Sequence, residues 1–289
     1  MHAMPTTLIE PAALLPHLGD PQWAVIDCRF ELARPDWGAG AYRAAHIPSA
    51  RYAHLERDLS GPRSERTGRH PLPDPTTLAA TLGRLGIDAT VQVIAYDQGS
   101  GAFAARLWWL LRWLGHRQVA VLDGGFAAWE RAALPVSSAD AARPARQFRA
   151  APDPSQLAST TEVSAALDSG ALASGAAILV DARSAERFAG ENETIDPVAG
   201  HIPGARNHPF SGNHDAHGRF LAAGELRAAW QRTLRGGAAH QLIAMCGSGV
   251  TACHDLLALE VAGLPGGRLY AGSWSEWICD PAHAVARGA

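Results

Sequence analysis

Residues 200–205 read GHIPGA, and residues 45–50 carry the near-identical turn AHIPSA. Each turn is preceded by an apolar strand that runs into an aspartate, WAVID at 23–27 and AILVD at 177–181. The two copies of each motif are separated by about half of the 289-residue chain. Self-similarity at so long a period indicates two related domains in tandem.

The two halves also share the order of their later elements. Each continues with a second apolar strand (91–96 and 241–245), a loop of small residues and a helix (102–115 and 251–262). A short strand and a Gly-Trp element follow in both halves. Strands that alternate with helices of this length predict an α/β fold, in which each domain is a parallel sheet flanked by helices on both faces.

The domain boundaries are predicted from a change in composition. Residues 135–154 are rich in Ala, Arg, Pro and Ser and show no hydrophobic periodicity, which is typical of a surface linker. We therefore expect an N-terminal domain over residues 1–136, a linker over 137–155 and a C-terminal domain over 156–289.

Composition narrows the class of function. A net charge of -3 disfavours nucleic acid or a membrane surface as the main partner. Residues 1–20 lack the pattern of a signal peptide, and the most apolar run, 107–114, is far shorter than the ~20 residues of a membrane span. Four cysteines in so long a chain do not form a disulfide framework. These features predict a cytoplasmic protein.

The loop after the second strand of the C-terminal half carries a candidate nucleophile. Residues 246–252 read CGSGVTA, and a helix is expected directly afterwards. Two glycines let several backbone N–H groups converge on one point, and the helix adds the positive end of its dipole. A cysteine there, Cys246, should remain a thiolate near neutral pH and could bear an added sulfur atom. Cys28, Cys253 and Cys279 lack such a loop, so we interpret them as structural.

A cysteine phosphatase uses a similar cradle but needs an arginine at the end of the loop to bind phosphate. Ala252 stands at that position, and the next arginine in the sequence is Arg268. The loop therefore favours a sulfur adduct over a phosphate dianion.

These motifs resemble the rhodanese superfamily over nearly the whole chain. The loop CGSGVTA is similar to that of its 3-mercaptopyruvate branch, whereas the thiosulfate branch typically has basic residues where Gly247 and Ser248 stand here. The resemblance implies a sulfurtransferase. It also implies a catalytically inactive N-terminal domain, because Asp97 occupies the position of the cysteine there.

The resemblance also implies the roles of individual residues. Cys246 would be the sulfur carrier, and Ser248 would relay a proton with His70 and Asp58. Arg187 would hold the carboxylate of the substrate, a task that suits a planar guanidinium. The remaining substrate-binding residues would be those of the loop, Gly247, Gly249, Val250 and Thr251. Arg183, directly after a strand, is interpreted as a structural ion-pair partner of Glu186 or Asp181.

One position departs from the pattern of the branch. A second carboxylate-binding arginine is usual about nine residues after Arg187, but Asp196 stands there, in an acidic segment. Arg206 or Arg106 could compensate for it. A donor other than 3-mercaptopyruvate therefore stays open.

The expected reaction is a two-step transfer through a Cys246 persulfide, with cyanide, a small thiol or a thioredoxin-like protein as acceptor. Two alternatives stay open: a thiosulfate sulfurtransferase, and a persulfide carrier or redox sensor without turnover. We expect no cofactor. We also expect no metal, because the histidines are scattered and the adjacent Cys253 and His254 point in different directions on a helix.

Overall fold

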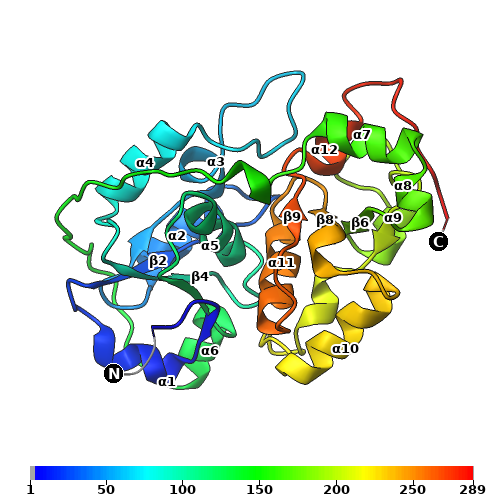
Figure 1. Ribbon diagram of the computed structural model, residues 1–289. Helices are drawn as coiled ribbons and strands as arrows, with labels where there is room; N and C mark the ends of the chain where they lie inside the picture. Colours follow the sequence, from blue (N-terminus) through cyan, green and yellow to red (C-terminus); the bar gives the residue numbers. More distant parts are fainter. Residues whose placement is uncertain (1–3, 289) are drawn as a thin grey trace. The chain divides into compact units, whose positions relative to one another are not determined.

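The computed structural model describes residues 4–288 and divides into two compact units. The first comprises Met1–Gly61, Pro73–Asp153 and His214–Phe220, and the second comprises Pro62–Leu72, Pro154–Asn213 and Leu221–Ala289. Most of each unit is one half of the chain (Figure 1). Each half also contributes one short segment to the other unit, which the sequence pattern did not predict.

The first unit contains a five-stranded parallel sheet with strand order β1-β5-β4-β2-β3. Its long central strands are buried along their whole length, as expected where helices cover both faces of a parallel sheet. Helix α5 packs on β4 and β5. The elements are β1 (Leu8–Ile9), α1 (Pro11–Leu14), β2 (Trp23–Asp27), α2 (Trp37–Ala44), β3 (Arg51–Tyr52), α3 (Leu55–Asp58), α4 (Pro75–Arg84), β4 (Gln92–Tyr96), α5 (Ala104–Trp113), β5 (Val119–Leu122) and α6 (Gly125–Arg131).

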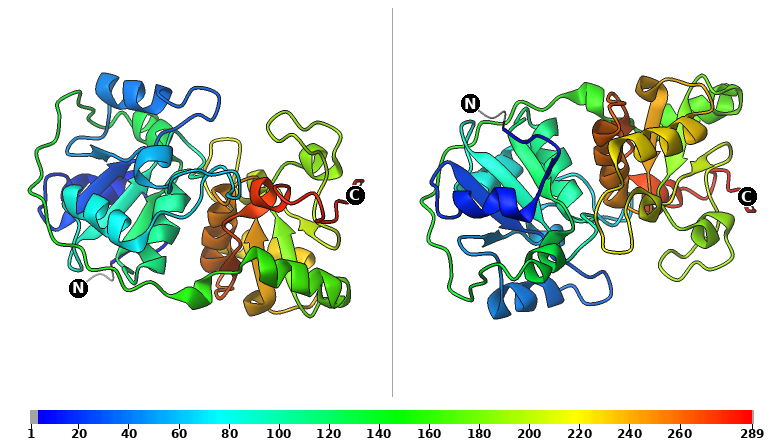
Figure 2. Two further views of the ribbon diagram at one scale, coloured as in Figure 1. Left: turned by 90° about the horizontal axis from the view of Figure 1, so that it is seen from above. Right: turned by 90° about the horizontal axis from the view of Figure 1, so that it is seen from below.

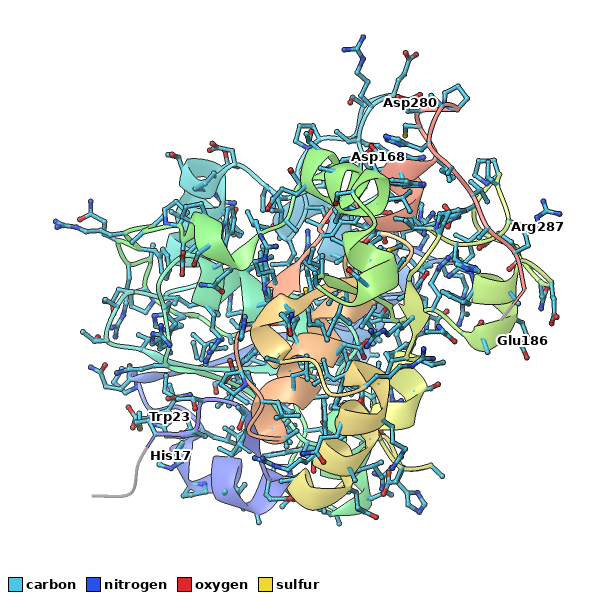
Figure 3. The ribbon with its side chains drawn as sticks, turned by 45° about the vertical axis from the view of Figure 1, so that its right-hand side comes forward. His17, Trp23, Asp168, Glu186, Asp280 and Arg287 are labelled. Atoms are coloured by element: carbon cyan, nitrogen blue, oxygen red, sulfur yellow. The ribbon has the colours of Figure 1, made fainter. Side chains whose placement is uncertain are left out.

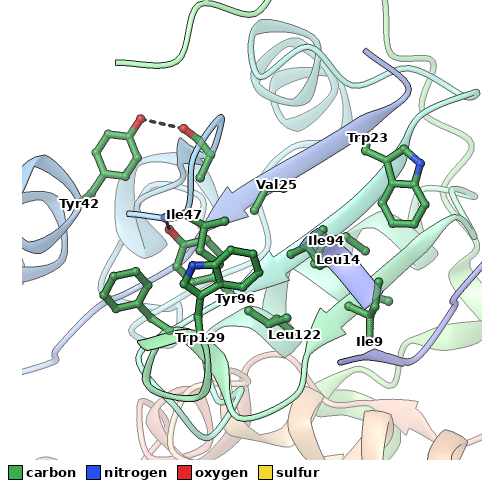
Figure 4. Close-up of a cluster of buried hydrophobic side chains, with 13 residues drawn as sticks. Ile9, Leu14, Trp23, Val25, Tyr42, Ile47, Ile94, Tyr96, Leu122 and Trp129 are labelled. Carbon is green, nitrogen blue, oxygen red and sulfur yellow. Dashed lines mark hydrogen bonds between the residues drawn. The ribbon is translucent and has the colours of Figure 1, made fainter. Parts of the chain in front are cut away.

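The core of this unit on one side of its sheet is a cluster of aliphatic and aromatic side chains (Figure 4). Within it the Tyr42 hydroxyl donates to the carbonyl of Ala50 at 2.9 Å, so that the polar end of a buried ring is satisfied. At the edge of the cluster the His17 ring stacks on Trp23 with 3.8 Å between centroids (Figure 3). This stacking covers the start of β2.

The second unit has a four-stranded parallel sheet with strand order β7-β6-β8-β9. Its elements are α7 (Thr160–Asp168), α8 (Ala171–Ser174), β6 (Ile178–Asp181), α9 (Ala185–Ala189), β7 (Arg206–Asn207), α10 (Ala223–Leu234), β8 (Leu242–Met245), α11 (Thr251–Val261), β9 (Arg268–Leu269) and α12 (Ser273–Trp277). In each unit helices flank a parallel sheet (Figure 2), and the predicted α/β fold is confirmed. No helix among residues 4–288 is both long and apolar enough to cross a bilayer.

The repeated Asp-x-Arg motif forms the same buried ion pair in both units. Arg29 contacts Asp27 at 2.6 Å, and Arg183 contacts Asp181 at 2.7 Å, with all four side chains at most 3% exposed. Each guanidinium also donates to a backbone carbonyl near the HIP turn, that of Ala45 or Gly200. The partner of Arg183 is therefore Asp181 and not Glu186. Losing one member of such a pair would strand a buried charge, at a cost of about 3–5 kcal/mol.

The repeated histidines are structural as well. Nδ1 of His46 lies 2.6 Å from the carbonyl of Tyr42, and Nδ1 of His201 lies 2.8 Å from that of Phe188. Each imidazole stacks on the aromatic ring of the same neighbour, at 4.1 Å and 3.7 Å. The sequence repeat thus arises from a shared way of joining a helix to the next turn.

Candidate active site

Cys246 lies at the carboxyl end of β8, just before helix α11. Its side chain is 2% exposed, and the backbone N–H of Gly249 points at its sulfur with an N···Sγ distance of 3.1 Å. Gly249 has a φ of +74°, and a Cβ there would lie 2.3 Å from the carbonyl oxygen of Ala271. Only glycine fits this position. The loop therefore directs a backbone N–H donor at the sulfur of the candidate nucleophile.

The start of α12 holds the same loop from a second side. The N–H groups of Trp274 and Ser275 donate to the carbonyls of Cys246 and Gly247 at 3.0 and 2.9 Å. The hydroxyl of Ser273 accepts from the N–H of Cys246 at 3.1 Å. Ser273 is fully buried and has a φ of +55°, a conformation that costs free energy in a residue other than glycine. Residues 273–275 at the start of α12 thus hold the backbone of Cys246 and Gly247 in place.

The corresponding loop of the first unit, between β4 and α5, has the side chain of Asp97 at the position of the cysteine. The carboxylate of Asp97 accepts four backbone N–H groups at 2.8–3.3 Å, those of Gly99, Gly101, Phe103 and Ala104. The N–H of Phe126 in α6 donates to the Asp97 carbonyl, as that of Trp274 in α12 does to Cys246. The loop between the second strand and the following helix therefore directs backbone N–H groups at one side chain in both units, four at Asp97 and that of Gly249 at Cys246.

His70 and Ser248 meet in the second unit, although they are far apart in the sequence. Nδ1 of His70 lies 2.7 Å from Oγ of Ser248, and the two residues are 2% and 5% exposed. His70 lies on the segment Pro62–Leu72, which belongs to the second unit. This segment is anchored by a 3.0 Å hydrogen bond from the N–H of Arg69 to Oγ of Ser275. A histidine and a serine in direct contact can pass a proton between them.

Asp58 has a local hydrogen-bonding role in the first unit. Its carboxylate accepts from the N–H of His54 at 2.8 Å, while Nδ1 of His54 accepts from the N–H groups of Glu56 and Arg57 at the start of α3. Asp58 and His70 belong to different units. A catalytic role for Asp58 stays a prediction.

Arg187, in the short helix α9, pairs with buried acidic side chains. Its Nε contacts both oxygens of Glu193 at 3.1 and 3.0 Å, and its Nη2 contacts Asp196 at 2.9 Å. Both acids are 2% exposed, and Glu193 also pairs with Arg183. Burial would raise the pKa of Glu193, but the hydrogen bond from Arg187 and two backbone N–H groups outweigh it and lower this pKa. Arg187 is thus held in place from two directions.

A second arginine, which the sequence pattern did not predict, reaches the cysteine loop. The guanidinium of Arg69 is hydrogen-bonded to the other oxygen of Asp196. A Cβ on Gly247 would lie 2.8 Å from Nη2 of Arg69 and 3.5 Å from Nη2 of Arg187, so both guanidinium groups lie beside this residue. The loop lacks cations in its sequence but not in its surroundings. The one available signal was the position of Arg69 between Gly68 and His70.

Arg206 and Arg106 are the two arginines considered from the sequence as replacements for the second carboxylate-binding arginine. Arg206 donates from Nη1 to the carbonyls of Thr233 and Leu234 at 2.8 and 2.7 Å, at the end of α10. Arg106 is fully buried within α5 of the first unit. Nη1 of Arg206 is thus tied to the end of α10, and a compensating role for Arg206 or Arg106 stays a prediction.

The other predicted residues frame the loop. Val250 is buried at the N-cap of α11, and Thr251 is the first residue of that helix.

The three other cysteines lie outside this loop. Cys28 is buried, which raises the pKa of its thiol well above the usual range. Cys253 donates to the carbonyl of Gly249 at 3.3 Å, and Cys279 is exposed. In the described part of the chain, no group of three or more His, Cys, Asp or Glu side chains is arranged to hold a metal.

Comparison with known proteins gives a consistent result. Residues 10–132 and 159–279 each match the family described as "Rhodanese-like domain". The chain is 50% identical over 283 residues to a "Probable 3-mercaptopyruvate sulfurtransferase" of Pseudomonas aeruginosa, covering 97% of this chain and 98% of the relative. It is 38% identical over 292 residues to a Mycobacterium tuberculosis protein named for thiosulfate instead, covering 100% and 99%.

A solved structure is similar as well. The crystal structure of a 3-mercaptopyruvate sulfurtransferase from Escherichia coli superposes with a TM-score of 0.80 at 34% sequence identity. The match covers 94% of this chain and 100% of that one. Fold, loop and comparisons therefore agree.

Proposed function

Because the chain belongs to the rhodanese family, we propose that this sulfurtransferase takes sulfur from 3-mercaptopyruvate and carries it as a persulfide on Cys246. One observation carries the proposal: the amide of Gly249 points at the Cys246 sulfur, while guanidinium groups lie beside the next residue. The first feature suits a sulfur anion, and the second suits a donor with a carboxylate. The name of the 50% identical relative supports the same donor.

The first half-reaction transfers sulfur to the enzyme. Arg187 holds the donor carboxylate, and the Cys246 thiolate attacks the donor sulfur. A new S–S bond forms as the C–S bond breaks, and the electron pair of that bond passes to carbon as the enolate of pyruvate. Ser248 gives this enolate a proton and recovers one from His70, which lies 2.7 Å away. The products are pyruvate and a Cys246 persulfide.

The second half-reaction removes the outer sulfur. A cyanide ion, a small thiolate or a reduced thioredoxin-like protein attacks it, the S–S bond breaks, and Cys246 leaves as the thiolate. Such acceptors suit the reducing cytoplasm, which we propose as the location, and the described cysteines are all free thiols. The amides of the 246–251 loop hold the persulfide between the two steps.

The first domain, over residues 1–136 before a linker at 137–155, is proposed to be inactive. Asp97 already occupies its cradle with four amide hydrogen bonds, and a carboxylate cannot carry sulfane sulfur. Catalysis is assigned to the domain over 156–289, completed by the segment Pro62–Leu72.

A mass measurement combined with rates tests the proposal. The wild-type protein treated with 3-mercaptopyruvate should gain one sulfur atom in its intact mass and lose it again with cyanide or a thiol. Cys246→Ser should abolish both this gain and turnover, whereas the control Cys279→Ser should retain both, because Cys279 is exposed and lies outside the loop.

Three outcomes would contradict parts of the proposal. Turnover by Cys246→Ser would remove the persulfide mechanism. A higher kcat/KM with thiosulfate than with 3-mercaptopyruvate would assign the other donor. A sulfur adduct that no small acceptor removes would indicate a carrier for a dedicated partner.

A further inference from the structure

The second unit has a cavity of about 1000 Å³ beside its short edge strand β7. Helices α8, α9 and α10 supply most of the remaining lining. The volume lies at the upper end of the range for sites that bind small organic molecules. No described residue of the 246–251 loop lines this cavity, so it is distinct from the place where sulfur is transferred.

Three arginines line the cavity from neighbouring elements. Arg206 lies on β7, Arg232 in the last turn of α10 and Arg235 directly after that helix. In the described part of the chain, none of the three forms an ion pair with an acidic side chain. Arg206 uses Nη1 for the carbonyls of Thr233 and Leu234, while its Nε and Nη2 have no hydrogen-bond partner among the described residues.

The positive charges around the cavity act on one another. Burial lowers the pKa of Arg206, and the charge of Arg235 lowers it further. Burial also lowers the pKa of His208, another lining residue, and the charge of Arg232 adds to this effect. A multivalent anion between these groups would relieve the repulsion, and guanidinium groups bind phosphate and carboxylate through paired hydrogen bonds.

Arg235 has a backbone conformation that favours glycine. Its φ is +51° and its ψ is +43°, in the left-handed region, directly after the end of α10. Glycine is the usual residue at such a position, and Gly236 and Gly237 follow immediately in the sequence. A residue other than glycine costs free energy there. The chain thus has a guanidinium at the cavity where the geometry of the helix end favours glycine.

Two acids also line the cavity, but they come from a different element. Glu186 lies in α9 and Glu191 just after it, and both are exposed. An anion is therefore expected on the side of β7 and α10, where the arginines are. Other lining residues are small and apolar, among them Ala173, Ala205 and Ala229. They suit an uncharged part of a ligand.

We propose that this cavity binds a small metabolite with a multivalent oxyanion, phosphate or carboxylate, held by Arg206, Arg232 and Arg235. The inference is independent of the proposed function. The competing explanation is that the three arginines only stabilise the C-terminal end of α10, where the helix dipole favours cations. The two explanations differ in what replacement of Arg235 by glycine does.

Thermal unfolding with two probes tests the site. Inorganic pyrophosphate and citrate represent the two kinds of oxyanion, and sodium chloride at the same ionic strength is the reference. At least one probe should raise the melting temperature of the wild-type protein, because a ligand that binds only the folded state stabilises it. A response to pyrophosphate alone supports a phosphate ligand, and a response to citrate alone supports a carboxylate. No response to either probe would overturn the proposal.

Arg235→Gly separates anion binding from the stability of the helix. In sodium chloride its melting temperature should equal or exceed that of the wild type, because glycine suits the left-handed conformation. Its Kd for the active probe, measured by calorimetry, should rise roughly 10-fold, the size expected for one lost hydrogen bond to a charged group. An unchanged Kd would overturn the proposal and leave Arg235 with a role at the helix end only.

Two further variants test the charge of the lining. Arg227→Gln changes an exposed arginine of α10 that does not line the cavity, so it is the matched control and should keep the wild-type Kd. Glu186→Gln removes a negative charge from the lining and should lower the Kd. A weaker affinity in Glu186→Gln would contradict an anionic ligand.

A last pair of measurements separates this cavity from the cysteine loop. Arg187→Gln should keep the response to the probe, because Arg187 does not line the cavity. Loss of the response in Arg187→Gln with retention in Arg235→Gly would place the anion beside the cysteine loop and overturn the proposal. Arg235→Gly should transfer sulfur at the wild-type rate, so the failure of this site would leave the proposed function intact.

Discussion

Asp255 on α11 has a carboxyl group in the interior of the second unit. It is fully buried, and its Oδ1 accepts from Nδ2 of Asn213 at 2.7 Å, while Oδ2 has no hydrogen-bond partner among the described residues. Burial raises the pKa of Asp255 well above its usual range, and the charge of Cys246 adds to this effect. The fold thus disfavours the charged form of the Asp255 carboxyl group.

This raised pKa predicts how stability depends on pH. Below the unfolded-state pKa of about 4, Asp255 is protonated in both the folded and the unfolded state. In that range its titration does not change the free energy of unfolding. As pH rises above that value, the unfolded state loses its proton while the folded state keeps it, so stability falls by about 1.4 kcal/mol for each unit of difference in pKa. Asp255→Asn removes the titration. It should therefore be more stable than wild type near pH 7, with the difference shrinking toward pH 4.

Urea unfolding at several pH values measures this difference. Asp280→Asn, at an exposed acid, is the control and should follow the wild-type curve. A constant difference between Asp255→Asn and wild type over the whole range would show that Asp255 does not titrate abnormally.

The loop between β8 and α11 depends on one backbone conformation. Gly249→Ala would place a methyl group against the Ala271 carbonyl, in a region of φ that costs about 1–3 kcal/mol for a residue other than glycine. The backbone can relieve the contact only by turning the Gly249 N–H away from the sulfur. We expect a lower melting temperature and slower persulfide formation in a single turnover.

Gly224→Ala provides the matched control for this loop prediction. Gly224 lies in α10 with open space around it, so this change should raise stability by about 0.5–1 kcal/mol without slowing the sulfur transfer. Unaltered persulfide formation in Gly249→Ala would mean that the amide does not assist the cysteine.

Many of the helices and strands could be predicted from the sequence. The strands ending at Asp27 and Asp181 and those ending at Tyr96 and Met245 were predictable, because buried parallel strands are short apolar runs. The role of Ser273 was not predictable, because a positive φ outside glycine leaves no sequence signal. The contact between α12 and the loop also needs the folded sheet to bring them together.

At the scale of the whole molecule, each half of the chain gives one segment to the other unit, Pro62–Leu72 and His214–Phe220. These two segments explain why part of the site could not be predicted from the sequence. Arg69 and His70 are encoded in the first half but belong to the second unit. No local pattern reports such a crossing, so Asp196 was interpreted as a missing arginine when it is the partner of one. The contact between Arg69 and Asp196 joins residues that are far apart in the sequence. An ion pair of this kind leaves no periodic pattern from which it could be predicted.

The exchange leads to a prediction for the complete chain. Replacing Pro62–Leu72 with a Gly-Ser linker of equal length removes Arg69 and His70, so sulfur transfer from 3-mercaptopyruvate should fall to background. The same replacement of His214–Phe220 removes the ion pairs of the Arg219 side chain with Glu10 and Asp123 in the first unit. It should lower the melting temperature but keep measurable transfer. Equal activity of the two variants would contradict the assignment.

The four backbone N–H groups around the Asp97 carboxylate also show how a duplicated domain of this kind can change its function in evolution. The first unit already holds an anion in a ring of four amides, at the place where the second unit has its cysteine. The scaffold and the reactive atom are therefore separable: at the same place in the fold, one unit has a carboxylate that braces the backbone and the other has a cysteine. A duplicated gene can silence one copy in this way without redesigning its fold, and laboratory evolution could start from that silent copy to install a different nucleophile.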